Sequence, residues 1–141
     1  MMSTPLEDLG RAVKQLQSRH QRMLDSRLME MGSSLAQWDA LRAIDRNPGA
    51  SSHALAEYTF QTDQSFGALA ARLVEKGLAR RAAGKGRALC YSLTATGTDI
   101  LQRGGVVAEE VLARSFAPLG ERERRELLTL LERLLNGGDA D

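Results

Sequence analysis

The chain has 141 residues, of which 43% are apolar and 26% are charged, the balance of one globular domain. No segment approaches the roughly 20 apolar residues of a membrane span, and no basic start precedes an apolar run as in a signal peptide. The single cysteine, Cys90, excludes an internal disulfide framework and is typical of a reducing compartment, so we expect a cytoplasmic protein.

The first element in chain order is a long helix over residues 6–31, with Pro5 at its start. Its apolar residues recur at steps of three and four, which predicts one apolar stripe along the helix. The stripe comprises Leu6, Leu9, Val13, Leu16, His20, Met23, Leu24, Leu28 and Met31. Gly32 is expected to end this helix.

Three shorter helices are predicted next, over residues 35–47, 51–59 and 62–77. Serine or threonine stands at the start of each and can cap the free backbone N–H groups, and Gly77 is expected to end the third. The residues expected to face inward are Leu35, Trp38, Leu41, Ile44, Leu55, Tyr58, Phe66, Leu69, Ala70 and Leu73.

A β-hairpin follows, with strands over residues 78–81 and 89–93 around the turn Gly-Lys-Gly-Arg. In the second strand Leu89, Tyr91 and Leu93 alternate with small or polar residues, which is the period of a half-buried strand.

Two further helices complete the chain. One begins near Thr94 and is expected to be weak at Gly104-Gly105, and the other is a leucine-rich helix over residues 121–137. We therefore expect a mainly α fold with a small β-hairpin wing.

Charge is spread unevenly along the chain. The whole chain has a net charge of +1, whereas residues 60–90 carry +4 and the remainder −3. A localised basic stretch attracts phosphate. Two helices joined by a short turn, followed at once by a basic hairpin, form a winged helix-turn-helix. The second helix of such a unit fits the DNA major groove, and a wing arginine suits the minor groove.

Four stretches carry a resemblance to a known family. LAQWDALRAI and PGASSHALAE correspond to the family's second and third helices. QTDQSFGALAARLVEKGLARR corresponds to its recognition helix and first wing strand. GRALCYSLTATG corresponds to its wing arginine, its second wing strand and its Leu-Thr-x-x-Gly signature. Over nearly its whole length the sequence resembles the MarR family of bacterial winged helix-turn-helix transcription regulators.

The resemblance implies a single MarR-type domain over residues 1–141. Residues 33–97 would form the winged helix-turn-helix DNA-binding region, and residues 5–31 and 98–136 the helical dimerisation region. It also implies a homodimer that binds a pseudopalindromic operator, usually as a repressor, and a small aromatic or phenolic effector that releases the DNA. No cofactor and no membrane contact are expected.

The DNA-binding residues expected on this basis are Ser51, Ser52, Thr62, Asp63, Gln64, Ser65, Arg72, Lys76, Arg80, Arg81, Lys85 and Arg87. The sequence departs from the family pattern at Gly84-Lys85-Gly86, where an Asp often precedes the wing arginine. It departs again at Gly67 and Ala68, where Thr and Arg often reach bases. Base reading should therefore depend on residues 62–65, where Gln64 can address adenine and Asp63 can accept from cytosine N4.

The effector residues expected at the junction of the first helix and the winged helix are His20, Met23, Trp38 and Arg42. For Trp38 the alternative is a core position, and for His20 it is a dimer contact. His53 is expected at the surface or near phosphate. Neither histidine has metal-ligand companions at suitable spacing, and Cys90 is interpreted as structural.

Two other function classes remain open at this point. One is a winged-helix protein-interaction module that has lost DNA binding, which the near-neutral net charge, Gly67 and Ala68 favour. The other is a small enzyme on a helical dimer, although the sequence contains no nucleophile–base–orienter set. The basic residues of the hairpin could simply be solvated. Thr62-Asp63 could simply cap the following helix.

Overall fold

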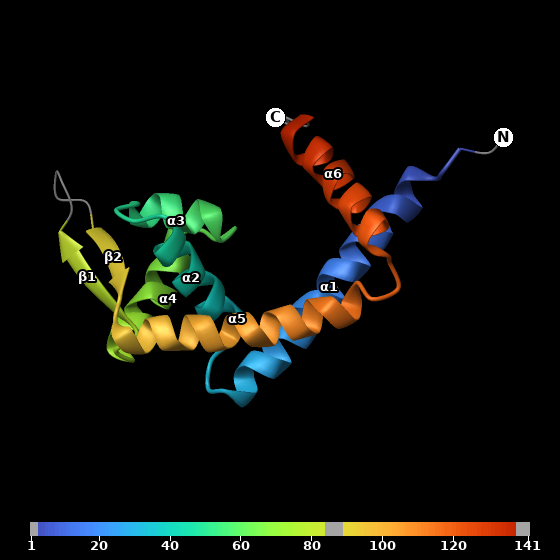
Figure 1. Ribbon diagram of the computed structural model, residues 1–141. Helices are drawn as coiled ribbons and strands as arrows, with labels where there is room; N and C mark the ends of the chain where they lie inside the picture. Colours follow the sequence, from blue (N-terminus) through green and yellow to red (C-terminus); the bar gives the residue numbers. More distant parts are fainter. Residues whose placement is uncertain (1–2, 84–88, 138–141) are drawn as a thin grey trace.

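The computed structural model describes residues 3–83 and 89–137 (Figure 1). Within these ranges the order is α1 (Leu6–Glu30), α2 (Leu35–Arg46), α3 (Ser52–Tyr58), α4 (Asp63–Glu75), β1 (Ala79–Ala83), β2 (Leu89–Leu93), α5 (Ala95–Ser115) and α6 (Glu121–Gly137). The expected mainly helical fold with a two-stranded hairpin is therefore confirmed. None of the described helices combines the length and apolar character needed to cross a membrane.

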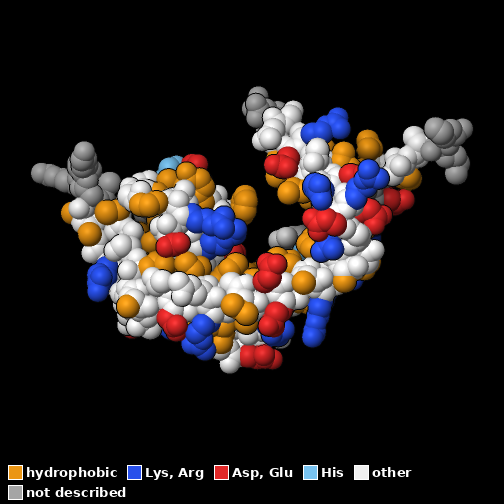
Figure 2. Space-filling model, viewed as in Figure 1, with side chains coloured by type: hydrophobic (Ala, Val, Ile, Leu, Met, Phe, Trp, Pro, Cys, Tyr) orange, Lys and Arg blue, Asp and Glu red, His pale blue; other side chains and the backbone are white. Residues whose placement is uncertain are grey.

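The elements form two parts that share the long helices α1 and α5 (Figure 1). Helices α2, α3 and α4 and the hairpin gather into one body. Helix α6 and the first half of α1, together called the arm (residues 6–18 and 121–137), project away from it. In the space-filling view, a wide hollow separates the body from the arm (Figure 2).

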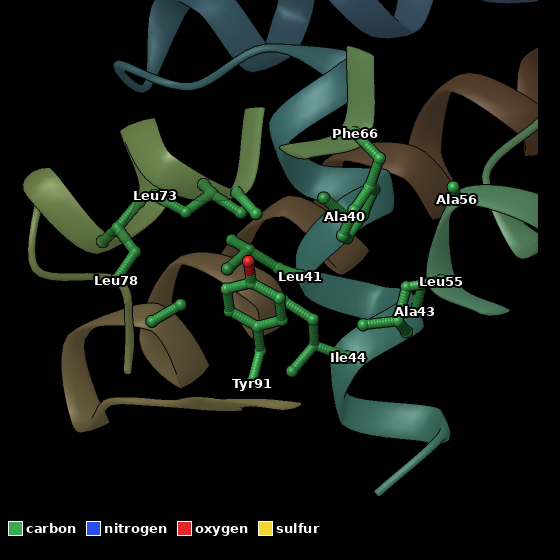
Figure 3. Close-up of a cluster of buried hydrophobic side chains, with 12 residues drawn as sticks. Ala40, Leu41, Ala43, Ile44, Leu55, Ala56, Phe66, Leu73, Leu78 and Tyr91 are labelled. Carbon is green, nitrogen blue, oxygen red and sulfur yellow. The ribbon is translucent and has the colours of Figure 1, made fainter. Parts of the chain in front are cut away.

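One hydrophobic core holds the body together (Figure 3). Fully buried side chains come from α2 (Leu41), α3 (Leu55) and α4 (Phe66). Tyr91 of β2 meets Phe66 edge to face, with ring centroids 6.2 Å apart. The core thus fixes α4 relative to the two preceding helices and to the hairpin that follows it.

Local signals in the sequence account for most helix boundaries. Helices α2, α3, α4 and α5 are capped by side-chain oxygens of Ser34, Ser51, Thr62 and Thr94. After α1 and α4, Gly32 and Gly77 have φ of 80° and 76°, a conformation that glycine adopts without steric cost. The helices consequently begin and end close to the expected residues.

Residues Leu93 to Gly97 fasten the start of α5 to the start of the hairpin. The Thr94 hydroxyl donates to the Gly77 carbonyl at 2.7 Å and accepts from the Gly97 N–H at 3.0 Å. The Thr94 N–H donates to the Leu78 carbonyl at 3.1 Å. A Cβ at Gly97 would lie 1.9 Å from that carbonyl oxygen, so the Leu-Thr-x-x-Gly sequence requires glycine at its last position.

The hairpin pairs β1 and β2 antiparallel, with Ala79 opposite Leu93 and Ala83 opposite Leu89. The first strand therefore extends two residues beyond the expected end at residue 81. The intervening residues 84–88, which include the predicted DNA-binding residues Lys85 and Arg87, lie outside the described residues.

Three details expected from the sequence were wrong. Tyr58 is 57% exposed, because it is the last residue of the short helix α3, whose buried side consists of Leu55 and Ala56. Leu89 is 45% exposed, because it pairs with the exposed Ala83 at the outer end of the hairpin. Helix α5 runs unbroken through Gly104-Gly105, since Gly104 is buried against another helix and does not end this one.

The arm leaves apolar side chains in contact with solvent. Helix α6 has no buried residue, and hydrophobic side chains lie among charged ones on the arm in Figure 2. The exposed apolar residues of the arm are Leu6, Leu9, Val13, Leu128, Leu130, Leu131, Leu134 and Leu135. In one copy of the described chain, the exposed fractions of these side chains run from 37% for Leu131 to 81% for Leu135.

Candidate nucleic-acid interface

Helices α3 and α4 are joined by a four-residue turn, residues 59–62. The Gln61 N–H donates to the Ala56 carbonyl at 2.8 Å, and Phe60 has a φ of 57°, which is uncommon for a residue other than glycine. Phe60 is also 96% exposed. With the hairpin directly after α4, the two helices form a winged helix-turn-helix.

The first turn of α4 presents Thr62, Asp63, Gln64 and Ser65 to solvent. The Thr62 hydroxyl accepts from the Ser65 N–H at 3.1 Å, and the Ser65 hydroxyl donates to Gln61 Oε1 at 3.2 Å. Thr62 and Ser65 therefore have local structural roles. Within the described part of the chain the Gln64 side chain makes no hydrogen bond, so its amide is free for an external partner.

Asp63 is held by a histidine that sequence reasoning did not connect to it. His53 Nδ1 lies 2.8 Å from Asp63 Oδ1, and His53 Nε2 lies 2.9 Å from Glu57 Oε1. The hydrogen bond and negative charge of Asp63, followed by the charge of Glu57, raise the pKa of His53 above 6.5. The contact between His53 and Glu57 could have been predicted, because the two residues are four apart on one helix and therefore lie on the same face.

The predicted basic residues separate into two groups. Arg72 on α4 and Arg80 and Arg81 on β1 are exposed, and the two strand arginines point to opposite faces of the hairpin. Lys76 is engaged elsewhere, since its Nζ donates to Gln37 Oε1 at 3.0 Å and to the Gly32 carbonyl at 3.4 Å. Lys76 therefore joins the end of α4 to the first turn of α2 and to Gly32 before it.

The predicted residues at the start of α3 lie beside the hairpin. The Ser51 hydroxyl accepts from the Ala54 N–H at 3.1 Å, and Ser51 forms an isolated bridge with Cys90 of β2. Ser52 is half-buried. Ser51 therefore caps α3 and joins it to the wing, and a DNA contact by either serine stays a prediction.

The four predicted effector residues are distributed over two places. His20 of α1 bonds the Ser115 hydroxyl at 2.5 Å and packs against the Phe116 ring at the end of α5. Burial, and then the charge of Arg19, lower the pKa of His20. Trp38 donates to the Leu101 carbonyl at 3.1 Å, near the start of α5.

Arg42 contacts Trp38, whereas Met23 lies in a separate groove. The Arg42 guanidinium stacks over the Trp38 ring, 5.7 Å from its centroid. Met23 lines a groove of about 340 Å³ between α1 and α5, together with Arg22, Ser26, Arg27, Val111 and Arg114. The set therefore does not form one cluster in a single described chain, and its role in effector binding stays a prediction.

A second cavity, of about 450 Å³, lies where α1, α2 and the α3–α4 turn meet. Its lining includes the charged residues Arg22, Asp25 and Asp39 beside the apolar Leu35 and Ala36. Asp25 accepts from the Leu35 N–H at 2.9 Å, so its carboxylate supports the start of α2. Burial raises the pKa of Asp39, and the nearby Arg42 partly opposes this effect.

The chain is similar to known proteins both over the body alone and over most of its length. The model of the MarR family matches residues 32–88, which run from before α2 through β1. The HTH-type transcriptional repressor Rv2887 of Mycobacterium tuberculosis is 32% identical over 109 residues, covering 76% of this chain and 78% of that protein. The chain belongs to the MarR family.

Solved structures of a MarR-family protein extend the likeness to the arm. The crystal structure of Rv2887 of M. tuberculosis in complex with p-aminosalicylic acid is 28% identical, with a TM-score of 0.76, covering 93% of this chain and 98% of that one. Its complex with DNA is 26% identical, with a TM-score of 0.75, covering 94% and 98%. The MarR family comprises transcriptional regulators and is not a class of enzyme.

Proposed function

We propose that this protein is a homodimeric, sequence-specific DNA-binding regulator of transcription, a repressor that a small aromatic acid releases from its operator. The first turn of α4 carries the proposal, because it presents the free amide of Gln64 from a helix that the core holds rigidly. Exposed Arg80 and Arg81 follow on the adjoining hairpin. The DNA complex of the relative Rv2887 supports the proposal.

The chemistry of these residues suits duplex DNA. A glutamine can bond adenine at two points in the major groove, and arginines can hold phosphates or enter the minor groove. Gly67 and Ala68, farther along α4, have no side chain that reaches a base. Sequence preference should therefore be modest, and phosphate contacts from the basic residues 60–90 should supply much of the affinity.

The arm supports a dimer. Leu134 and Leu135 of α6 are 67% and 81% exposed, and Leu6 of α1 is 80% exposed. Pairing with the same elements of a second copy would cover both apolar stripes, and a symmetric pair suits a pseudopalindromic operator.

The groove between α1 and α5 suits an aromatic acid. Met23 and Val111 supply apolar surface, while Arg22 and Arg114 can bind a carboxylate. Rv2887, whose complexes with salicylic and p-aminosalicylic acid are known, supports this ligand class. Because α5 joins the hairpin to the arm, a ligand between α1 and α5 can change the spacing of the two DNA-binding units.

The competing function is a protein-interaction module built on the same fold. It is favoured by the absence of base-reading side chains at Gly67 and Ala68 and by the acidic pair Asp63 and Glu57 near the start of α4. The net charge of +4 over residues 60–90 opposes it.

The proposed function is tested by recovering DNA with the purified protein. Genomic fragments of the source organism are passed over it, and the retained fragments are sequenced. Affinity for a retained fragment and for a scrambled duplex is then measured against salt concentration. We expect an enriched inverted repeat and a steep loss of affinity with salt. If no DNA fragment is enriched, or if binding does not depend on salt, the protein-interaction function becomes the better explanation.

A further inference from the structure

Three side chains at the junction of α3 and α4 form a continuous bridge. His53 lies between Asp63 of α4, at 2.8 Å, and Glu57 of its own helix, at 2.9 Å. A neutral imidazole has one N–H and can donate to one carboxylate only, whereas the imidazolium donates to both. Two carboxylates at these distances favour the imidazolium over the neutral ring, which agrees with the raised pKa of His53.

The bridge is exposed, so it contributes little to folding. The side chains of His53, Asp63 and Glu57 are each about two-thirds exposed, and surface ion pairs of this kind have small effects on stability. Its position matters more, because Asp63 is the first residue of the helix that we propose reads DNA.

A carboxylate at that place has two opposite effects on DNA binding. It can accept a hydrogen bond from cytosine N4 in the major groove, but its charge repels the phosphates. His53 addresses both effects, since it fixes Asp63 Oδ1 and places a positive charge beside it. The other carboxylate oxygen of Asp63 accepts no hydrogen bond within the described residues.

We propose that His53 is a positioning residue for base recognition, which holds Asp63 with one oxygen turned to a cytosine and offsets the charge that Asp63 and Glu57 bring to the DNA. This inference rests on the proposed function. It assigns a base preference to the Asp63 position and a pH dependence to the affinity, with His53 as the titrating group.

The charges that face His53 define the sign of that pH dependence. They are Asp63 from α4 and Glu57 from α3. Helix α2 and strand β2 also pack against α3, but no charged residue of α2 contributes to the pKa shift of His53, and β2 has no charged side chain. Both carboxylates favour the imidazolium. The positive charge is therefore fully present below about pH 6.5 and is lost as the pH rises through the raised pKa of His53. Affinity for DNA should fall over the same interval.

The experiment selects binding sites from a pool of random duplexes, at about pH 6 and about pH 8, on either side of the ordinary histidine pKa. The proteins are the wild type, His53→Ala, His53→Gln, Asp63→Ala and the double variant His53→Ala/Asp63→Ala. Glu75→Gln is the matched control, because it removes one negative charge from the other end of α4 without touching the bridge. Circular dichroism verifies that each variant is folded.

We expect one position in each half-site to prefer cytosine in the wild type and in Glu75→Gln. That preference should fall at least threefold in His53→Ala and vanish in Asp63→Ala, and the double variant should match Asp63→Ala. His53→Gln should retain part of the preference through its amide donor. Its affinity should depend much less on pH between about 6 and 8, because the imidazole that titrates beside Asp63 is absent.

The outcomes separate this inference from the proposed function. If the wild type enriches no sequence, the proposed function fails and the inference fails with it. If the wild type enriches a site, but His53→Ala selects the same bases with the same pH dependence, DNA binding stands and the role of His53 is wrong. If His53→Ala changes base preference even without Asp63, then His53 contacts a base itself and is not a positioning residue.

Discussion

The indole of Trp38 lies directly against the backbone of Gly104. A Cβ at Gly104 would be 2.4 Å from Trp38 Cδ1 and 2.7 Å from Nε1, and Leu28 Cδ2 would be 3.1 Å away. The same indole donates to the Leu101 carbonyl, one turn earlier on α5. Three helices therefore meet at Gly104, where the body joins α1 and α5.

Substitution of this glycine should loosen that junction. Gly104→Ala forces Trp38 to move, and we expect a loss of about 1–3 kcal/mol in the free energy of unfolding, as for an overpacked core. Gly105→Ala is the control, because nothing lies within 4 Å of its Cβ position. It should stabilise the helix by about 0.5–1 kcal/mol. Urea unfolding followed by circular dichroism measures both, and equal effects would contradict the packing described here.

Gly97→Ala should have a larger effect. Its Cβ would lie 1.9 Å from a backbone oxygen, that of Leu78, which cannot turn aside as a flexible side chain can. We expect a loss of more than about 3 kcal/mol, or failure to fold. Gly67→Ala, on an open face of α4, should instead gain up to about 1 kcal/mol. Thermal unfolding of both variants provides the test, and a stable Gly97→Ala protein would contradict the close approach at Leu78.

The proposed dimer can be tested at α6. Leu134→Glu and Leu135→Glu place charges on side chains that are 67% and 81% exposed in one chain, so they should not disturb an isolated chain. If these leucines are buried between two copies, the double variant should sediment as a monomer or unfold at micromolar concentration. Glu132→Gln is the matched control on the same helix. A wild-type protein that is a folded monomer under these conditions would refute the dimer.

How much of this structure the sequence could predict depends on the range of the interaction involved. The caps Ser34 and Thr62 and the terminating Gly77 act within one turn, so the helices could be located from the pattern alone. The bridge from His53 to Asp63 could not, because it depends on the angle at which the core sets α3 against α4. The engagement of Lys76 by Gln37 depends likewise on how α4 meets the start of α2.

The predicted effector set shows the same limit. His20 faces Ser115 and Trp38 faces Leu101, positions that are roughly 20 Å apart along α5 at 1.5 Å per residue. Helical periodicity placed both residues on inward faces, but it contained no information on which part of α5 each would meet.

An effector bound between α1 and α5 should nevertheless be sensed by Trp38, the only tryptophan in the sequence. Salicylate is the probe, and we expect a shift or quenching of the emission at the concentration that releases DNA, because α5 contacts the indole. Arg114→Gln should weaken salicylate binding about tenfold by removing one carboxylate partner. Arg103→Gln, on α5 outside the groove, is the control. Release of DNA with unchanged emission and an unaltered Arg114→Gln response would place the effector elsewhere.

If α4 binds DNA, substitutions of Gln64 and of Arg72 should change DNA binding in different ways. Both side chains are exposed on this helix, Gln64 in its first turn and Arg72 near its end. Arg72→Ala should weaken binding to operator and scrambled DNA alike and should flatten the salt dependence, because each lost phosphate contact removes about 0.9 from the slope of log affinity against log salt.

Gln64→Ala should leave that slope nearly intact. It should cost about 1–3 kcal/mol on the operator for each good base contact and little on scrambled DNA, because an uncharged amide binds a base edge and releases no counterion. Titrations of both variants at several salt concentrations on both duplexes distinguish the two roles. If Gln64→Ala keeps the full preference of the wild type for the operator, α4 does not read bases through its first turn. The protein-interaction function would then become the better explanation of the fold.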